Sequence, residues 1–180
     1  RKLVLRQYRR GGLVGSLVKR SYLWTGLENT RPFCELKLLA DIQQTPVAAC
    51  KPYAARIIRK GLVYQAQLIT EQVLDSETLG ELLQSSQVSN DILQATGQAI
   101  RVMHDQQIHH ADLNANNILI SNGDAVLIDF DRGRVRASRL LDWRGTSLER
   151  LRRSINKLQQ RHGFEFSDEQ WHCLLQAYSA

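Results

Sequence analysis

Three oxygen-bearing side chains in the middle of the chain have the types, order and spacing that phosphoryl transfer from ATP requires. Asp112 lies in a polar segment, Asn117 follows it by five residues, and Asp129 follows Asn117 by twelve. In this chemistry one Asp orients the acceptor hydroxyl, while an Asn and a second Asp hold magnesium. His-x-Asp or Asp-Phe-Asp alone is usually a loop or a strand end, but the ordered combination between apolar segments indicates a phosphotransferase.

The apolar segments around these residues predict a β-hairpin. Residues 117–120 and 125–128 flank Ser-Asn-Gly-Asp, and Asn-Gly between two apolar runs is typical of a type I′ turn. Closing the hairpin returns Asp129 to the end at which Asn117 lies. Magnesium prefers hard oxygen ligands and takes its other ligands from waters and phosphates. The Asn and the second Asp are therefore expected to hold Mg²⁺, with Asp112 nearby for the acceptor.

The composition is that of an ordinary globular protein. The 180 residues are 43% hydrophobic and 23% charged, which suits one domain or two small lobes. No apolar run reaches the roughly 18–20 residues of a membrane helix, and no secretory signal peptide is recognised at the start. The cysteines, Cys34, Cys50 and Cys173, are widely spaced, which argues against a disulfide framework or a Cys-based zinc site and indicates a reducing cytoplasm.

The formal net charge of +6 predicts an acidic partner, such as nucleic acid, an anionic membrane surface or a phosphorylated substrate. Basic and apolar residues are mixed over residues 9–24. This segment suits an anionic membrane or the acid groups of a lipid-linked sugar, and equally a solvated basic face. Its glycines, Gly11, Gly12 and Gly15, match no phosphate-binding fingerprint, so a turn is favoured.

Hydrophobic periodicity predicts strands in the first half of the chain and helices in the second. Strands are expected at residues 3–8, 54–58 and 62–70, and helices at residues 30–42, 78–83, 91–106, 146–160 and 168–178. Thr30 and Ser167 are expected to cap two of these helices. In the helix at residues 91–106, the core is expected to take Ile92, Ala95, Ile100 and Met103. The basic surface of the helix at residues 146–160 is expected to be plain solvated helix.

This order of elements is that of a bilobal kinase, an α+β fold. A small strand-rich lobe would span residues 1–73 and a larger helical lobe residues 74–180, with ATP in the cleft. Residues 69–73 would form the hinge, where backbone groups commonly receive the adenine. Glu71 lies in this segment and is expected to contribute to ATP binding.

The chain resembles the lipopolysaccharide-core kinases of the protein-kinase-like superfamily, and is most similar to those that act on 3-deoxy-D-manno-octulosonic acid (Kdo). The resemblance rests on His-x-Asp-Leu-Asn-x-x-Asn-Ile-Leu, which begins at His110, and on Ile-Asp-Phe-Asp, which begins at Ile128. It extends to residues 3–12 with their Arg-Arg-Gly-Gly element, 30–35, 51–56, 64–71 and 151–154. It therefore covers nearly the whole chain.

The resemblance implies roles for individual residues. Asp112 corresponds to the catalytic Asp, Asn117 to the Asn of the catalytic loop, and Asp129 to the metal-binding Asp. Glu35 matches the helical Glu that pairs with a basic residue of the third strand, and that basic residue looks like Arg6. Glu35 and Arg6 would thus position ATP.

The resemblance also implies ligands and a location. ATP is the donor, with Mg²⁺, and the acceptor is the 4-hydroxyl of Kdo on the lipid A precursor. The protein would be peripheral on the cytoplasmic face of the bacterial inner membrane. Its partners would be a lipid-linked acidic sugar and an anionic membrane surface, and no nucleic acid is expected.

The chain departs from the general kinase pattern at three places. Arg6 replaces the usual Lys, and a planar guanidinium does not position phosphates as an ammonium does. Asp131 stands where the Gly of Asp-Phe-Gly would be. The Gly-rich loop normally precedes the third strand, and the chain begins inside that strand, so an N-terminally truncated small lobe is expected.

Other interpretations of the chain are a heptose kinase or another small-molecule kinase of the same fold, a RIO-like protein kinase, and a nucleotide-binding pseudokinase. The complete Asp-Asn-Asp set argues against the pseudokinase, whereas Arg6 argues for it. His109 and His110 lack the second patterned ligand pair of a metal site. His110 is instead expected to brace the catalytic loop by hydrogen bonding.

Overall fold

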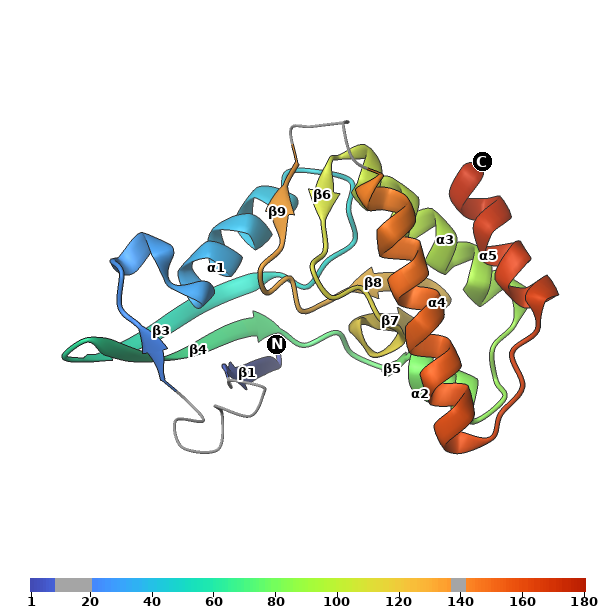
Figure 1. Ribbon diagram of the computed structural model, residues 1–180, viewed down its shortest axis with the longest axis horizontal. Coiled ribbons are helices and arrows are strands. Elements are labelled where there is room, and N and C mark those ends of the chain that lie inside the picture. The colour runs from blue at the N-terminus through green and yellow to red at the C-terminus, as the bar shows by residue number, and fades with distance from the viewer. Residues whose placement is uncertain (9–20, 137–141) are drawn as a thin grey trace. The chain divides into compact units, whose positions relative to one another are not determined.

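The computed structural model describes residues 1–8, 21–136 and 142–180 (Figure 1). These residues form two compact units. The first unit comprises Arg1–Gln44 and Cys50–Gln72, and the second comprises Thr45–Ala49 and Val73–Ala180. Residues 45–49, which the sequence pattern assigned to the small lobe, therefore pack within the second unit.

An antiparallel sheet forms much of the first unit. Its members are β1 (Leu3–Gln7), β2 (Tyr22–Leu23), β3 (Pro52–Lys60) and β4 (Val63–Glu71). β4 pairs with β3 along one edge, and with β1 and β2 along the other. Alternate residues of β4, namely Tyr64, Ala66 and Leu68, are buried, as expected for a sheet with one covered face. The strands predicted from periodicity are present. β3 is longer than predicted, and β4 has the predicted length but is shifted by one residue.

The helix α1 (Arg31–Ile42) packs against β3 and β4. It begins after Thr30, with Pro32 in its first turn, where the missing N–H has no helical partner to lose. The Thr30 hydroxyl donates to the carbonyl of Leu27, 2.7 Å away, and so does not cap the helix. The buried face of α1 is apolar except for Glu35.

The second unit contains a three-stranded antiparallel sheet and a separate two-stranded ribbon. The sheet runs β5 (Ser76–Thr78), β7 (Ile118–Ser121) and β8 (Asp124–Leu127), and the ribbon pairs β6 (Ile108–His109) with β9 (Arg134–Val135). The turn between β7 and β8 has φ +52° at Asn122 and +88° at Gly123. Positive φ at both central residues is the property of a type I′ turn, so the predicted hairpin is confirmed.

Four α-helices complete the described part of this unit. They are α2 (Leu79–Gln84), α3 (Asn90–Asp105), α4 (Trp143–His162) and α5 (Asp168–Ser179). Ser167 caps α5 as predicted, in a capping box with Gln170. No helix among residues 1–8, 21–136 and 142–180 is both long and apolar enough to cross a membrane.

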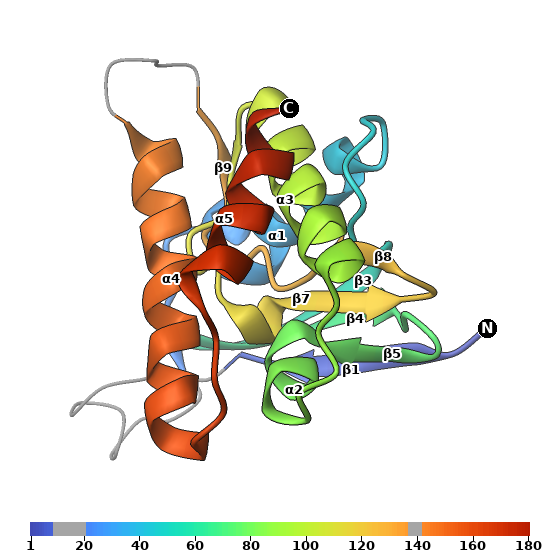
Figure 2. The same cartoon turned by 90° about the vertical axis from the view of Figure 1, so that its right-hand side faces the viewer.

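The packing of α3 against α5 refines one sequence-based prediction (Figure 2). A Cβ on Gly97 would lie 2.3 Å from the carbonyl oxygen of Leu174, so the two helices approach backbone to backbone there. The contact turns the Gly97 side of α3 inward and buries Leu93 fully. Ile100 and Met103 are fully buried, as predicted. Ile92 and Ala95 are half-buried and lie at the margin of the buried face rather than at its centre.

Candidate active site

The polar segment around Asp112 joins β6 to the 3₁₀ turn η3 (Ala115–Asn117), which leads into β7. His110 holds the start of this segment. The residue is 1% exposed, and Nδ1 of its ring accepts from the backbone N–H of Asp112 at 3.2 Å. The proton is therefore on Nε2, which donates to the carbonyl of Ile128 at 2.8 Å. The prediction that His110 braces the loop is confirmed.

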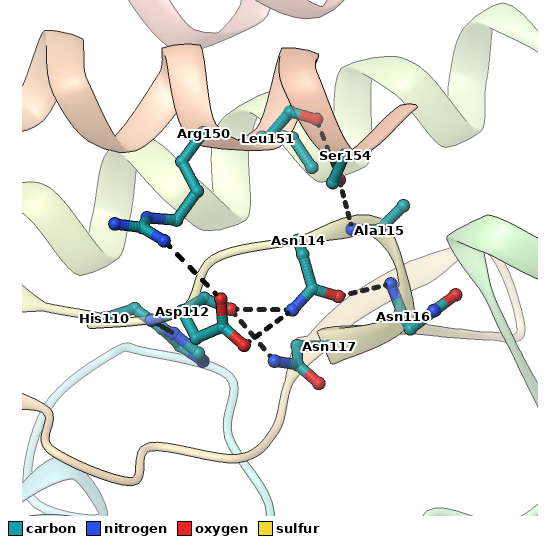
Figure 3. Close-up of polar contacts among 9 residues, drawn as sticks. All are labelled: His110, Asp112, Asn114, Ala115, Asn116, Asn117, Arg150, Leu151 and Ser154. Atoms are coloured by element: carbon teal, nitrogen blue, oxygen red, sulfur yellow. Dashed lines mark hydrogen bonds and ion pairs between the residues drawn. The ribbon is translucent and has the colours of Figure 1, made fainter. Parts of the chain in front are cut away.

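Asn114 fixes the carboxylate of Asp112 (Figure 3). Its Nδ2 donates to the carbonyl oxygen of Asp112 at 2.9 Å and to Oδ2 of the same residue at 3.2 Å. Its Oδ1 accepts from the N–H of Asn116 at 2.9 Å and so caps η3. One side chain thereby joins the loop backbone to the carboxylate of Asp112.

Asn117 is oriented by its own amide nitrogen. Nδ2 donates to the carbonyl oxygen of Asp112 at 2.9 Å, and Figure 3 shows the amide oxygen pointing away from that contact. The backbone carbonyl of Asn117 accepts from the N–H of Ile128 at 3.0 Å. Because Nδ2 is used inside the loop, Oδ1 is the atom that the side chain presents outward, and an amide oxygen is a hard ligand.

The hydrogen bond between Asn117 and Ile128 also places Asp129, because Asp129 is the next residue after Ile128. Its φ of +62° is left-handed, a conformation that few non-glycine residues adopt and that clusters at functional sites. Phe130 is fully buried and packs on the ring of His110, with ring centroids 4.7 Å apart. The left-handed residue therefore sits between the hairpin and a buried anchor. Asp112, Asn117 and Asp129 meet at one end of the hairpin.

The helix α4 supports the loop from another direction. The Oγ of Ser154 accepts from the N–H of Ala115 at 3.0 Å and donates to the carbonyl of Leu151 at 2.9 Å. One turn earlier on α4, Arg150 brings Nη1 to 3.7 Å from Oδ1 of Asp112 (Figure 3). Both side chains are about half exposed or more, at 47% and 66%. Such a pair contributes little to stability, so its consequence is a cation beside the carboxylate.

The first unit brings Arg6 and Glu35 together as predicted. The carboxylate of Glu35, on α1, accepts from the guanidinium of Arg6 and from the hydroxyl of Tyr8, both on the N-terminal segment of the unit. The Glu35 side chain is 1% exposed, whereas that of Arg6 is 31% exposed. Burial, reinforced by the charge of Glu35, raises the pKa of Tyr8, so the phenol stays protonated and donates.

Tyr8 was not predicted from the sequence as part of this cluster. It lies two residues after Arg6, and residues i and i+2 of an extended segment point to the same face, which is the signal that would have identified it. It also contacts the guanidinium of Arg6 through its ring, with 4.9 Å from Cζ to the ring centroid.

Glu71 ends β4 and has other contacts than those predicted for a hinge residue. Its Oε1 accepts from Nε of Arg1 at 3.0 Å, and its backbone N–H donates to the carbonyl of Lys51 at 2.8 Å. Its assignment to ATP binding stays a prediction.

Replacing Glu35 by Ala is expected to lower the free energy of unfolding by about 2–3 kcal/mol, because the hydrogen bonds of Arg6 and Tyr8 to a buried carboxylate are lost. The change leaves Arg6 and the hydroxyl of Tyr8 without their shared acceptor. Urea denaturation followed by circular dichroism measures the difference. Glu28→Ala is the control, since Glu28 is exposed in the same unit and its replacement is expected to stay within about 0.5 kcal/mol. Equal effects of the two replacements would contradict the assignment.

The oxygen ligands available in the second unit suit magnesium better than a transition metal. No group of three His, Cys, Asp or Glu side chains placed to hold a metal occurs in the part of the chain that the structure describes. Asn117 and Asp129 offer one amide oxygen and one carboxylate. That donor set fits an ion that keeps waters and takes phosphate oxygens for its remaining positions.

Some sequence-based predictions lie outside the described residues. These are the turn at Gly11, Gly12 and Gly15, and the basic pairs Arg9-Arg10 and Lys19-Arg20.

Comparisons with known proteins find matches over nearly the whole chain. The sequence model described as "Lipopolysaccharide kinase (Kdo/WaaP) family" matches residues 1–178. A 3-deoxy-D-manno-octulosonic acid kinase of Photobacterium profundum is 40% identical over 177 residues, which are 98% of this chain and 74% of the relative. A protein of the same description from Vibrio cholerae serotype O1 is 42% identical over 166 residues, covering 92% of this chain and 70% of the relative.

One solved structure, "WaaP in complex with acyl carrier protein", is similar with a TM-score of 0.62 and 15% sequence identity. The alignment covers 97% of this chain and 74% of that one. At this identity the likeness concerns the fold alone, and it confirms the predicted α+β, kinase-like class.

Proposed function

The chain belongs to the lipopolysaccharide kinase (Kdo/WaaP) family, and from this premise we propose that it transfers the γ-phosphoryl group of ATP to the 4-hydroxyl of Kdo on the lipid A precursor. Family membership makes it a phosphotransferase. The observation that carries the proposal is the ordered set Asp112, Asn117 and Asp129 at one end of the hairpin, in a chain about 40% identical to Kdo kinases.

Asp112 is the residue that we assign to the acceptor. Its carboxylate orients the hydroxyl and accepts the hydroxyl proton late, as the oxygen–phosphorus bond to the acceptor forms and the bond to the leaving ADP breaks. Asn114 contributes by holding the carboxylate through Oδ2 and the backbone carbonyl. Arg150 places a positive charge beside the carboxylate of Asp112.

Asn117 and Asp129 are the residues that would hold Mg²⁺. The ion would neutralise charge on the donor phosphates, which is its usual contribution in this reaction class. These two residues keep two hard oxygen atoms at the end of the hairpin. The Nδ2 contact orients the side chain of Asn117, and the left-handed backbone places Asp129.

We assign the positioning of ATP to residues of the first unit. Arg6 is held by Glu35 and Tyr8, so its guanidinium is restrained at small cost in side-chain entropy when it meets phosphate oxygens. The segment at residues 69–73, with Glu71, is proposed to receive the adenine. In this proposal the two units correspond to the small and large lobes of a kinase.

The proposed location is peripheral, on the cytoplasmic face of the bacterial inner membrane, where a lipid-linked acceptor would be met. The net charge of +6 supports an anionic surface as a partner. The basic side chains along α4 contribute part of that charge.

Acceptor profiling tests the proposal. The purified protein is incubated with Mg-ATP and, in parallel, with Kdo-linked lipid A precursor, a heptosylated core acceptor and a generic protein substrate. We expect phosphate on the Kdo acceptor, located at the 4-position by NMR of the product. Transfer to heptose or to protein instead would assign the chain to another kinase of the same fold. Nucleotide binding without transfer to any acceptor would indicate a pseudokinase.

A further inference from the structure

A two-stranded ribbon brings basic residues beside the catalytic loop. β9 pairs with β6 antiparallel, with Arg134 opposite His109, and the N–H of Arg136 donates to the carbonyl of Gln107 at 2.8 Å. Directly opposite residues of an antiparallel pair project on the same face. Arg134 and His109 therefore share a face, and the chain reaches Asp112 three residues after His109.

The helix α4 contributes a third guanidinium to the same place. Trp143, at its start, contacts the ring of His109 edge-on, with centroids 5.7 Å apart. Arg150 lies seven residues later, close to two helical turns, and so on the same side of α4. There it reaches Asp112 at 3.7 Å.

The electrostatics of His109 agree with this arrangement. Burial lowers the pKa of His109 to about 4, with further lowering by the charges of Arg136, Arg134, His110 and Arg150 in that order. The pairing of β6 with β9 is what brings Arg134 and Arg136 close to this ring. His109 is then neutral at pH 7, and the local charge comes from the arginines.

The arginines are not balanced by carboxylates. In the described residues, no ion pair is found for Arg134 or Arg136, and Arg150 has Asp112 as its single partner, at a long distance. The Nε of Arg136 is buried without a hydrogen-bond partner in that part of the chain. Acidic side chains of neighbouring helical turns are engaged elsewhere, since Glu149 pairs with Arg153, and Asp105 with Arg101 and Arg144.

Three guanidinium groups gathered around His109, of which Arg150 is near the carboxylate of Asp112, repel one another and gain when an anion binds. Arginine is well suited to such a role because its planar donors match the oxygens of a carboxylate or phosphate. The nearest reacting group is Asp112, which is assigned to the acceptor hydroxyl, so the anion is expected on the acceptor.

We infer that Arg134, Arg136 and Arg150 form an anion subsite next to Asp112 that binds an acid group of the acceptor and so places its hydroxyl at Asp112. This inference rests on the proposed function for the identity of the acceptor. The shared chemistry is an oxyanion, which is either the carboxylate of the sugar acid itself or a phosphate of the attached lipid.

The test uses Arg134→Gln, Arg150→Gln and the double variant, because both side chains are exposed enough to be replaced without loss of core packing. We expect each replacement to raise the KM for Kdo-linked lipid A precursor about tenfold, and the double variant about 100-fold, as for loss of charge-assisted hydrogen bonds. The KM for ATP is expected to stay within about twofold. Lys at either position should restore part of the affinity, because it keeps the charge.

Arg161→Gln is the control, since Arg161 carries the same charge on the last turn of α4 but lies about 16 Å along the helix from Arg150. Its acceptor KM is expected to match that of the unchanged protein. A raised KM for ATP with an unchanged acceptor KM in the double variant would overturn the inference and assign the arginines to the donor.

Two modified acceptors distinguish the sources of the anion. If the subsite binds the sugar carboxylate, a Kdo methyl ester loses affinity for the unchanged protein but not for the double variant. If the subsite binds a lipid phosphate, the dephosphorylated acceptor is the one that loses affinity for the unchanged protein but not for the double variant. If each modified acceptor loses as much affinity for the double variant as for the unchanged protein, the subsite inference is wrong.

Equilibrium binding separates this inference from the proposed function. Micelles of Kdo-linked lipid A precursor are titrated into each variant without ATP, and the double variant should bind about 100-fold more weakly. That difference stands even if the unchanged protein fails to phosphorylate Kdo, in which case the proposed function alone is wrong. If the unchanged protein phosphorylates Kdo but the double variant binds the acceptor as tightly as the unchanged protein, the subsite alone is wrong.

Discussion

Replacement of Asp112 by Asn is expected to reduce kcat for transfer to the Kdo acceptor by about 10²- to 10⁴-fold, the range typical of a lost general base. The amide has the shape of the carboxylate but does not take the acceptor proton. The contacts that organise the loop use the backbone of residue 112, because Nδ2 of Asn114 and Nδ2 of Asn117 both donate to its carbonyl oxygen. The loop should therefore survive the replacement, and the loss should be in chemistry.

Single-turnover assays with saturating Mg-ATP measure this effect apart from acceptor binding. Thermal unfolding of Asp112→Asn should match that of the unchanged protein, since the Asp112 side chain is exposed and its ion pair with Arg150 is long. Asp124→Asn removes an exposed carboxylate at the start of β8 and serves as the control. A kcat for Asp112→Asn within about threefold of that control would refute the role of Asp112.

The catalytic half of the site was predictable because local signals determine it. Asn122 and Gly123 specify the turn, and the apolar runs on each side specify the strands, so Asp129 returns to Asn117 without any distant contact. His110 is likewise fixed by neighbours, through the N–H of Asp112 and the carbonyl of Ile128, at the end of the same hairpin.

The basic half was not predictable because it depends on tertiary packing. Arg150 is one of several arginines on α4, and periodicity does not say which of them reaches Asp112. That choice follows from the contact of Trp143 with His109 and from Ser154 bonding to Ala115. Local sequence signals alone therefore indicate plain solvated surface for this helix.

The same limit explains why the most buried face of α3 differs slightly from the predicted one. Periodicity placed Ile92 and Ala95 inward because they are apolar, but the close approach at Gly97 selects the face of the helix that contacts α5. A glycine inside a helix lowers helical propensity, and here it allows two backbones to touch. The tertiary contact thus rotates the buried face of α3 slightly away from the face that the local pattern predicts.

The pair of Arg6 and Glu35 came from family resemblance rather than from spacing. These residues lie on a strand and a helix far apart in sequence, and no local pattern joins them. Tyr8 completes the pair because strand alternation puts it beside Arg6.

Replacement of Asp129 by Asn is expected to lower kcat about 10²-fold or more, and to raise the Mg²⁺ concentration needed for half-maximal rate. Asp129 is the charged member of the proposed ligand pair, whereas Asn117 is neutral, so the change removes the negative charge that the ion would meet. Asn is the informative replacement because Asn, like Asp, tolerates the left-handed backbone observed at this position, where φ is +62°. Ala there would add backbone strain to the loss of a ligand.

Initial rates over a series of Mg²⁺ concentrations, with ATP held constant, measure both changes. Thermal unfolding without nucleotide should be alike for the unchanged protein and Asp129→Asn, because Phe130 remains buried against His110 and keeps the segment in place. Addition of Mg-ATP should raise the melting temperature of the unchanged protein more than that of the variant. An unchanged Mg²⁺ dependence together with a full rate would exclude Asp129 as a ligand. If kcat falls while the Mg²⁺ dependence stays the same, Asp129 acts on the reaction by another route, and Asn117 would have to hold the ion without it.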